Sequence, residues 1–300
     1  MVEFLHERGT LFHIGFSFFF LIFLLGLNRL QRSLPSPVNK MLVRWTRLMV
    51  TALFCGLLFK ASILPSVPYW RLCLIGLLLW CLIESLYIWF YIVTWDRSEL
   101  PLFPKIKSVD RVDWPANKRF FMIRDWIRQN NYEEIGAFRY FFQDVVMQHS
   151  VVYQSPDRTI RMQVLIVPDS TGVILDQVVF YSQNANDKVF ITDNIFMPFG
   201  GVYPEDWSVN RYASVRKVEG LVKRHINVLS HAGETCIQID SDPLAWVEET
   251  QHRLEKLNIE HGLLNSLADR EEFGKLTGEG RYRIWKELLL LNYFCKSTVV

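Results

Sequence analysis

Histidines and carboxylates supply most metal ligands and general acid–base groups in proteins. The seven histidines of this 300-residue chain are scattered, with no His-Glu-x-x-His motif. Glu249 and His252 form a Glu-x-x-His pair in the predicted helix 242–261. A di-iron site needs a second copy on a neighbouring helix, but the other pair in the sequence, Glu3 and His6, lies before the first apolar run. His225 lies on the same apolar helical stripe as Val218 and Val222. A single histidine in such a stripe is usually a core residue whose ring nitrogens are hydrogen-bonded. We therefore predict no catalytic residue and no metal site.

Motifs for nucleophiles, nucleotides and thiol chemistry are also missing from the sequence. It contains no G-x-S-x-G, G-x-x-x-x-G-K-[ST] or G-x-G-x-x-G pattern, and its five cysteines form no C-x-x-C pair. Asp157, Asp187 and Asp193 fall in predicted turns, where aspartate favours local backbone bonding. We predict no cofactor. The formal net charge of +2 argues against a nucleic-acid partner.

Two charged residues lie inside long apolar runs, where charge is costly. Lys60 is roughly 6 Å from the end of its run, so it can reach the lipid headgroups. Glu84 lies roughly 18 Å from the outer end of its run, near the membrane midplane. We expect Glu84 to contact protein, through Thr51 on the preceding helix or through a partner subunit. A proton or ion pathway through Glu84 is the alternative.

The apolar runs cover about residues 11–27, 48–64 and 72–93, and each is long enough to cross the hydrocarbon core. They predict a membrane region over residues 1–95 with three transmembrane helices. The link between the first two runs is basic and has no acidic residue, whereas residues 65–70 carry no charge. Because basic loops stay in the cytoplasm, we expect the N-terminus outside and the C-terminal domain in the cytosol, in a plasma or inner membrane. The basic residues of the first link are Arg29, Arg32, Lys40, Arg44 and Arg47.

The rest of the chain predicts a proline-containing linker over residues 96–117 and one α+β domain over residues 118–300. Apolar residues predict helices at about 116–129, 214–229 and 281–294. The N-cap Asp242, Pro243 after it and Gly262 predict a further helix at about 242–261. Alternation and turn residues predict an antiparallel β-meander with one face buried. Its strands are expected at residues 138–142, 150–154, 159–167, 173–181 and 188–192.

The predicted helix at 214–229 has a basic side as well as an apolar one. Its cations are Arg216, Lys217, Lys223 and Arg224. They predict a solvated face, or a surface that meets anionic lipid or an acidic partner.

These features favour a membrane-anchored, non-catalytic interaction or assembly subunit of a larger membrane complex. Its expected partners are the lipid bilayer and another membrane protein or a second copy of the chain. A membrane-bound enzyme is the alternative, with a cytosolic site assembled from Asp157, Asp193, Glu205 and His225. An accessory subunit of a transporter, with Glu84 in the coupling path, also stays open.

Overall fold

The computed structural model describes residues 2–33, 36–96, 105–142, 145–168, 174–233, 235–266, 268–269 and 274–298. The chain divides into two compact units. The helical unit comprises Met1–Val93 and Leu288–Cys295, and the sheet unit comprises Thr94–Glu287 and Lys296–Val300.

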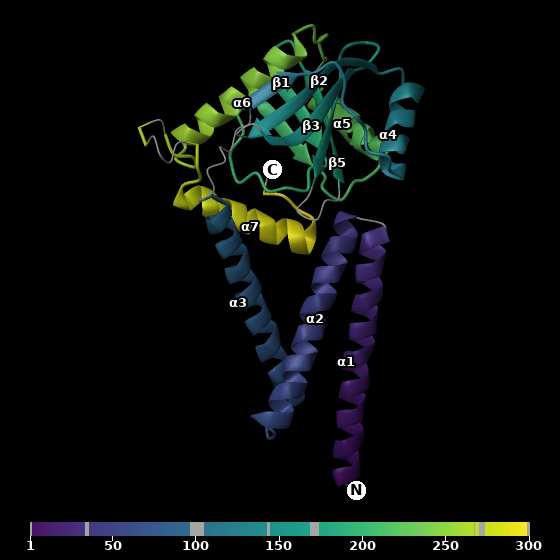
Figure 1. The fold of residues 1–300 in the computed structure, drawn as a ribbon, viewed down its shortest axis with the longest axis vertical. Helices are drawn as coiled ribbons and strands as arrows, with labels where there is room; N and C mark the ends of the chain where they lie inside the picture. Colours follow the sequence, from purple (N-terminus) through teal and green to yellow (C-terminus); the bar gives the residue numbers. More distant parts are fainter. Residues whose placement is uncertain are drawn as a thin grey trace. The chain divides into compact units, whose positions relative to one another are not determined.

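Three long helices build most of the helical unit: α1 (Val2–Ser33), α2 (Pro37–Ser62) and α3 (Tyr69–Asp96) (Figure 1). Each contains a stretch that is long and apolar enough to cross a membrane. The prediction of three N-terminal helices that are long and apolar enough to span a membrane is therefore confirmed. The stretches are Leu11–Ser33, Pro37–Ser62 and Tyr69–Trp95.

Helix α2 begins well before its predicted start at residue 48. Pro37 takes the first turn after Ser36, where its missing N–H costs no helical bond. Lys40, Arg44 and Arg47 consequently lie on the helix, not in a loop over residues 28–47. Hydropathy marked only the apolar part of α2, because a helix can continue past the segment that lipid would cover.

Small residues allow α2 and α3 to approach closely. A Cβ atom on Gly76 would lie 2.7 Å from Cys55 Cβ, and one on Gly56 would lie 2.5 Å from Cys73 Sγ. Small side chains at such crossings are typical of helices that pack without hydrophobic driving force. The two helices are therefore in close contact at Gly56 and Gly76.

The sheet unit contains one seven-stranded sheet whose strands lie in sequence order. All neighbouring strands are antiparallel except β6 and β7, which run parallel. The antiparallel order of the five predicted strands is confirmed, but a purely antiparallel meander is wrong, because residues 194–206 cross over before β7. The strands are β1 (Lys105–Ser108), β2 (Glu133–Phe142), β3 (Val145–Gln154), β4 (Arg161–Pro168), β5 (Ile174–Gln183), β6 (Val189–Asp193) and β7 (Trp207–Arg211).

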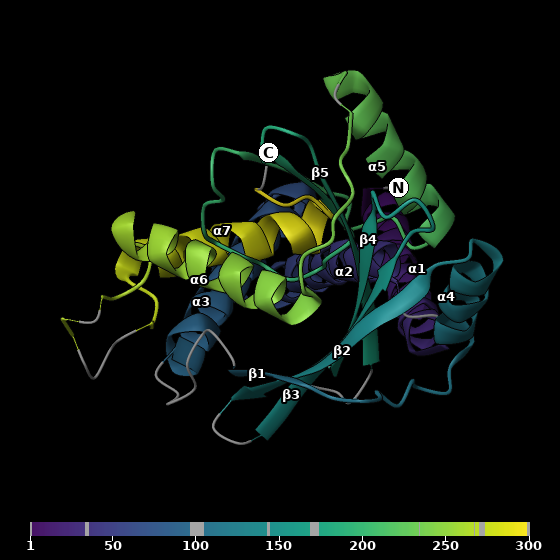
Figure 2. The ribbon, with the colours of Figure 1, turned by 90° about the horizontal axis from the view of Figure 1, so that it is seen from above.

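Helices cover both faces of this sheet, so the prediction of one buried face is wrong (Figure 2). On one face, α4 (Lys118–Gln129) and α5 (Val218–Ala232) pack on the apolar side of β4, which includes Met162 and Val164. On the other face, α6 (Pro243–Glu260) contributes Val247 to a cluster with residues of β2 and β3.

Polar residues on the second face of β4 are buried because the protein bonds them internally. Arg161 donates to the carbonyl oxygens of Ile239 and Ser241, and its guanidinium lies 5.8 Å from the Trp246 ring centre. Gln163 bonds to side chains of β2, β3 and β5. Alternation alone could not distinguish these residues from a solvent-exposed face.

The predicted helices of the sheet unit are confirmed in position. Helix α6 follows the N-cap Asp242, which accepts from the Ala245 N–H at 2.8 Å. It ends before Gly262, whose φ is 67°. Helix α7 (Gly278–Phe294) belongs to both units: it contributes residues up to Glu287 to the sheet unit and the rest to the helical unit.

Candidate functional site

A buried ionic network lies where β6 and β7 end. Parallel pairing places Asp193 directly beside Arg211. Arg211 Nε donates to Asp193 Oδ1 at 2.8 Å and Arg211 Nη2 donates to Asp193 Oδ2 at 3.3 Å, so the ion pair is bidentate. Arg211 Nη1 also lies 3.6 Å from Oε1 of Glu287 on α7. All three side chains are at most 3% exposed, so the network is closed to solvent.

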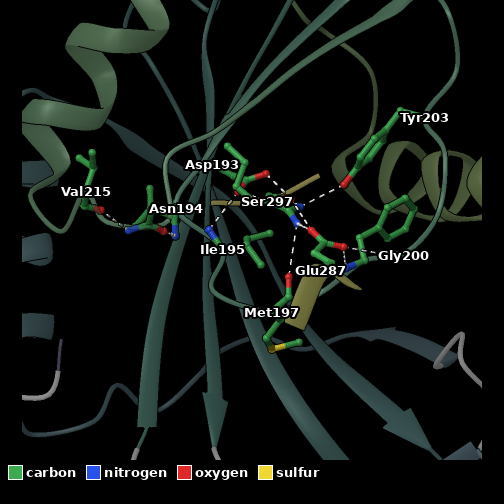
Figure 3. Close-up of polar contacts among 12 residues, drawn as sticks. Asp193, Asn194, Ile195, Met197, Gly200, Tyr203, Val215, Glu287 and Ser297 are labelled. Carbon is green, nitrogen blue, oxygen red and sulfur yellow. Dashed lines mark hydrogen bonds and ion pairs between the residues drawn. The ribbon is translucent and has the colours of Figure 1, made fainter. Parts of the chain in front are cut away.

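The loop between β6 and β7 holds the Glu287 carboxylate from the other side (Figure 3). The N–H groups of Phe199 and Gly200 both donate to Glu287 Oε2 at 2.8 Å, and Ser297 bonds Oε1. Gly200 has a φ of 66°, a conformation that lets successive N–H groups point at one anion. The network therefore joins β6, β7, the loop and α7.

Burial and charge pairing act in opposite directions on the pKa values of Asp193 and Arg211. Burial raises the pKa of Asp193, while the ion pair with Arg211 opposes that rise. Burial would lower the pKa of Arg211, but the neighbouring carboxylates outweigh it and raise that pKa above its usual value. Tyr203 completes the shell, bonded to Arg211 Nη2 at 3.1 Å. Because these polar groups bond each other, we assign the network a structural role.

Beside the network, the sheet unit has a cleft of about 570 Å³. One wall is residues 200–209, and the other is an α7 face whose lining residues are spaced three or four apart. Three aromatic and four charged residues line it. They are Tyr203, Trp207 and Tyr282, with Glu205, Glu279, Arg283 and Lys286.

The structure does not assemble the four residues of the alternative enzyme site. Asp193 is sealed in the network, and Glu205 lines the cleft. Asp157 caps the β3–β4 turn, where hydrogen bonds, first from Ser155, lower its pKa. Among the described residues, no hydrogen bond or ion pair joins any two of the four.

His225 is a core residue, as its position on the apolar stripe predicted. It is fully buried and lies between Ser182 Oγ at 3.0 Å and Thr192 Oγ1 at 2.9 Å. Burial lowers its pKa to about 4. Its ring is therefore neutral and bonded at both nitrogens.

The four predicted basic residues do not form one helix face. Helix α5 starts at Val218, so Arg216 and Lys217 precede it. Arg216 lies 3.6 Å from the buried Asp176 on β5. Lys223 and Arg224 are exposed on α5, and the Arg224 guanidinium lies 5.2 Å from the Tyr212 ring centre.

In the helical unit, Glu84 contacts protein through partners that the sequence did not indicate. Its carboxylate bonds Arg44 on α2, Trp80 Nε1 at 3.0 Å and the hydroxyl of Tyr293 on α7. Thr51 instead donates to the Arg47 carbonyl at 3.0 Å, so the expected Glu84–Thr51 bond is replaced by an ion pair with Arg44.

Lys60 lies at the other end of α2, where its Nζ donates to the carbonyl oxygens of Pro65 and Val67 at 3.0 and 3.1 Å. The α2–α3 turn therefore holds this cation. Arg44 was missed as a partner of Glu84 because the sequence placed it in a loop. Tyr293 is 209 residues from Glu84, a separation for which local sequence has no signal.

Within the residues that the structure describes, no three histidine, cysteine, aspartate or glutamate side chains gather as metal ligands. Comparison with known proteins yields no match to a protein-family model, a curated protein or a solved structure.

Proposed function

We propose that this chain is a membrane-anchored, non-catalytic interaction subunit that binds a segment of another protein in the cleft of its sheet unit. The observation that carries the proposal is the pairing of that cleft with the buried network behind it. The network fixes both walls, because Glu287 comes from α7 and Phe199 and Gly200 come from the opposing loop. A fixed binding surface loses little entropy on association.

The residues in the cleft are of the types that dominate protein interfaces. Tyrosine, tryptophan and arginine are enriched among the residues that contribute most to binding, and Tyr282, Trp207 and Arg283 line this cleft. Tyr282 is 47% exposed. The cleft volume of about 570 Å³ falls within the usual range for ligand-binding pockets. Charges of both signs in one cleft suit a polypeptide better than a small anion.

The non-catalytic part of the proposal rests on where the reactive groups lie. Asp193 and Glu287 are buried and bonded to Arg211, and His225 is sealed in the core. Neither the network carboxylates nor the His225 imidazole lines the cleft. A binding role uses the cleft as it stands, whereas an enzyme would need its acid–base groups supplied by Glu205, Glu279 and Lys286.

Topology is part of the same proposal. We place the N-terminus outside and the sheet unit in the cytosol of a plasma or inner membrane, with another membrane protein or a second copy as the partner. Five basic residues between Arg29 and Arg47 support this orientation, against no charge in residues 65–70.

Affinity purification of the full chain in mild detergent, with quantitative mass spectrometry, tests the proposal. Tyr282→Ala and Arg283→Ala should each reduce recovery of a stoichiometric partner by about tenfold or more, as loss of a major interface residue does. Ile237→Ala is the matched control, because Ile237 is also exposed but does not line the cleft. Unchanged recovery of the partner with both cleft variants would contradict the proposal.

A further inference from the structure

The N-terminal ends of α4 and α5 are tied together by one buried carboxylate. Asp176 on β5 bonds Arg119 Nε, and its other oxygen lies 3.6 Å from Arg216 Nη2. Arg119 Nη2 also donates to the Arg216 carbonyl at 3.0 Å. Two arginines therefore share one acid, which leaves a net positive charge and fixes the two helix ends side by side.

Further cations flank this tie. Lys118 opens α4 and Lys217 occupies the N-cap of α5; both are exposed, and neither has an ion-pair partner among the described residues. Both helices also direct the positive ends of their dipoles here. Acidic Asp125 and Glu219 are exposed on the same helices, so they reduce the local positive charge without cancelling it.

Apolar side chains protrude among these cations. Phe121 is 49% exposed and Met122 51% exposed. Met122 and Lys217 line one shallow groove of about 150 Å³ between the two helices. That volume is below the usual range for a ligand pocket, so this surface suits a broad contact better than an inserted peptide.

We propose that this corner, defined by Lys118, Phe121, Met122 and Lys217, docks on the anionic leaflet of the membrane that the chain itself spans. Lysines around protruding apolar side chains are characteristic of interfacial membrane-binding surfaces. The connection to α3 limits how far the sheet unit can lie from the membrane. Nine peptide steps join Asp96, at the end of α3, to Lys105, at the start of the sheet, and they reach at most about 30 Å.

Site-specific photocrosslinking of the full chain in lipid nanodiscs tests the proposal. Phe121→benzoylphenylalanine should form lipid adducts, detected by mass spectrometry, in discs that contain phosphatidylserine. Ile237→benzoylphenylalanine, on an exposed position away from the corner, should not. Lys118→Gln with Lys217→Gln should reduce the adduct yield about 5-fold per lysine, whereas Lys256→Gln on α6 should leave it unchanged.

Three results would overturn the proposal: no lipid adduct at position 121 above the Ile237 control, equal adduct yields in neutral and anionic discs, or crosslinks to protein in place of lipid. A measurement on the unaltered chain guards against misfolded variants. Amide hydrogen exchange in residues 118–123 should be slower in anionic than in neutral discs, and equal rates would also overturn the proposal. The inference rests on the cytosolic placement of the sheet unit proposed above. None of these results bears on the cleft, so peptide binding in the cleft can hold or fail independently of lipid docking.

Discussion

Buried carboxylates in this protein are each held by arginine. Among the described residues these acids are Asp176, Asp193 and Glu287, which pair with Arg119 or Arg211. Removing one partner of such a pair is costly, because the other charge stays buried without compensation. Replacing only one residue of such a pair should therefore destabilise the protein more than replacing both residues with apolar ones.

Glu84 is the corresponding acid in the helical unit, with a side chain that is 10% exposed. Glu84→Ala should lower the unfolding free energy by about 2–3 kcal/mol, below the value for a fully buried pair because Arg44 is 33% exposed. Lys60→Ala should cost less than about 1 kcal/mol, since the freed turn carbonyls can bond water. Unfolding in detergent measures both, and equal, negligible effects would contradict the assignment.

His225 predicts a pH dependence with a definite sign. Its pKa falls from 6.5 to about 4 on burial, so the unfolded state binds more protons between these values. The associated stability is full above pH 6.5 and is lost as the pH falls to about 4, on the order of 3 kcal/mol in total. His225→Gln should make the fall in melting temperature over this interval shallower.

The exposed His231 provides the matched control for this measurement. His231→Gln should leave the pH dependence of the melting temperature as it is in the unaltered chain. If the melting temperature of His225→Gln falls with pH as steeply as that of the unaltered chain, the buried imidazole does not control acid stability.

At the scale of elements, the start of α7 makes a close backbone contact within the sheet unit. A Cβ atom on Gly280 would lie 2.4 Å from the Leu263 carbonyl oxygen. That oxygen already accepts from the Thr277 N–H at 3.0 Å. The start of α7 is thus in backbone contact with the segment that follows α6.

Gly280→Ala should therefore destabilise the protein by about 2 kcal/mol, because backbone must move to admit the methyl group. Gly278→Ala, in the same turn, meets nothing within 4 Å and should be neutral within about 0.5 kcal/mol. Melting temperatures of the two variants give the comparison. Equal values would mean that the close approach at Gly280 has no energetic weight.

At the scale of the whole molecule, the orientation in the membrane is the property that decides which compartment each unit serves. In a background without native cysteines, Ser66→Cys should react with a membrane-impermeant maleimide added outside intact cells. Ser36→Cys should react only after permeabilisation, because basic residues flank it on both sides. The reverse pattern would place the sheet unit outside the cytosol.

The sequence by itself determined the features that depend on local composition. Three helices follow from runs of apolar residues that match the thickness of a bilayer. Helix α6 follows from a cap at Asp242, a proline after it and a glycine at residue 262. Strands β2 to β6 follow from alternation and turn residues, because short links force neighbouring strands to be antiparallel.

Only the tertiary structure decided the features that depend on distant partners. Strand β1 lies within the predicted linker and β7 lies outside every predicted strand, so only their pairing with β2 and β6 defines them. The sequence predicts Asp193 to be a turn residue, whereas the structure pairs it with Arg211, 18 positions away. Glu287 bonds a backbone N–H 88 positions away. Local sequence patterns do not indicate such contacts, because these contacts become favourable only when folding buries both partners together.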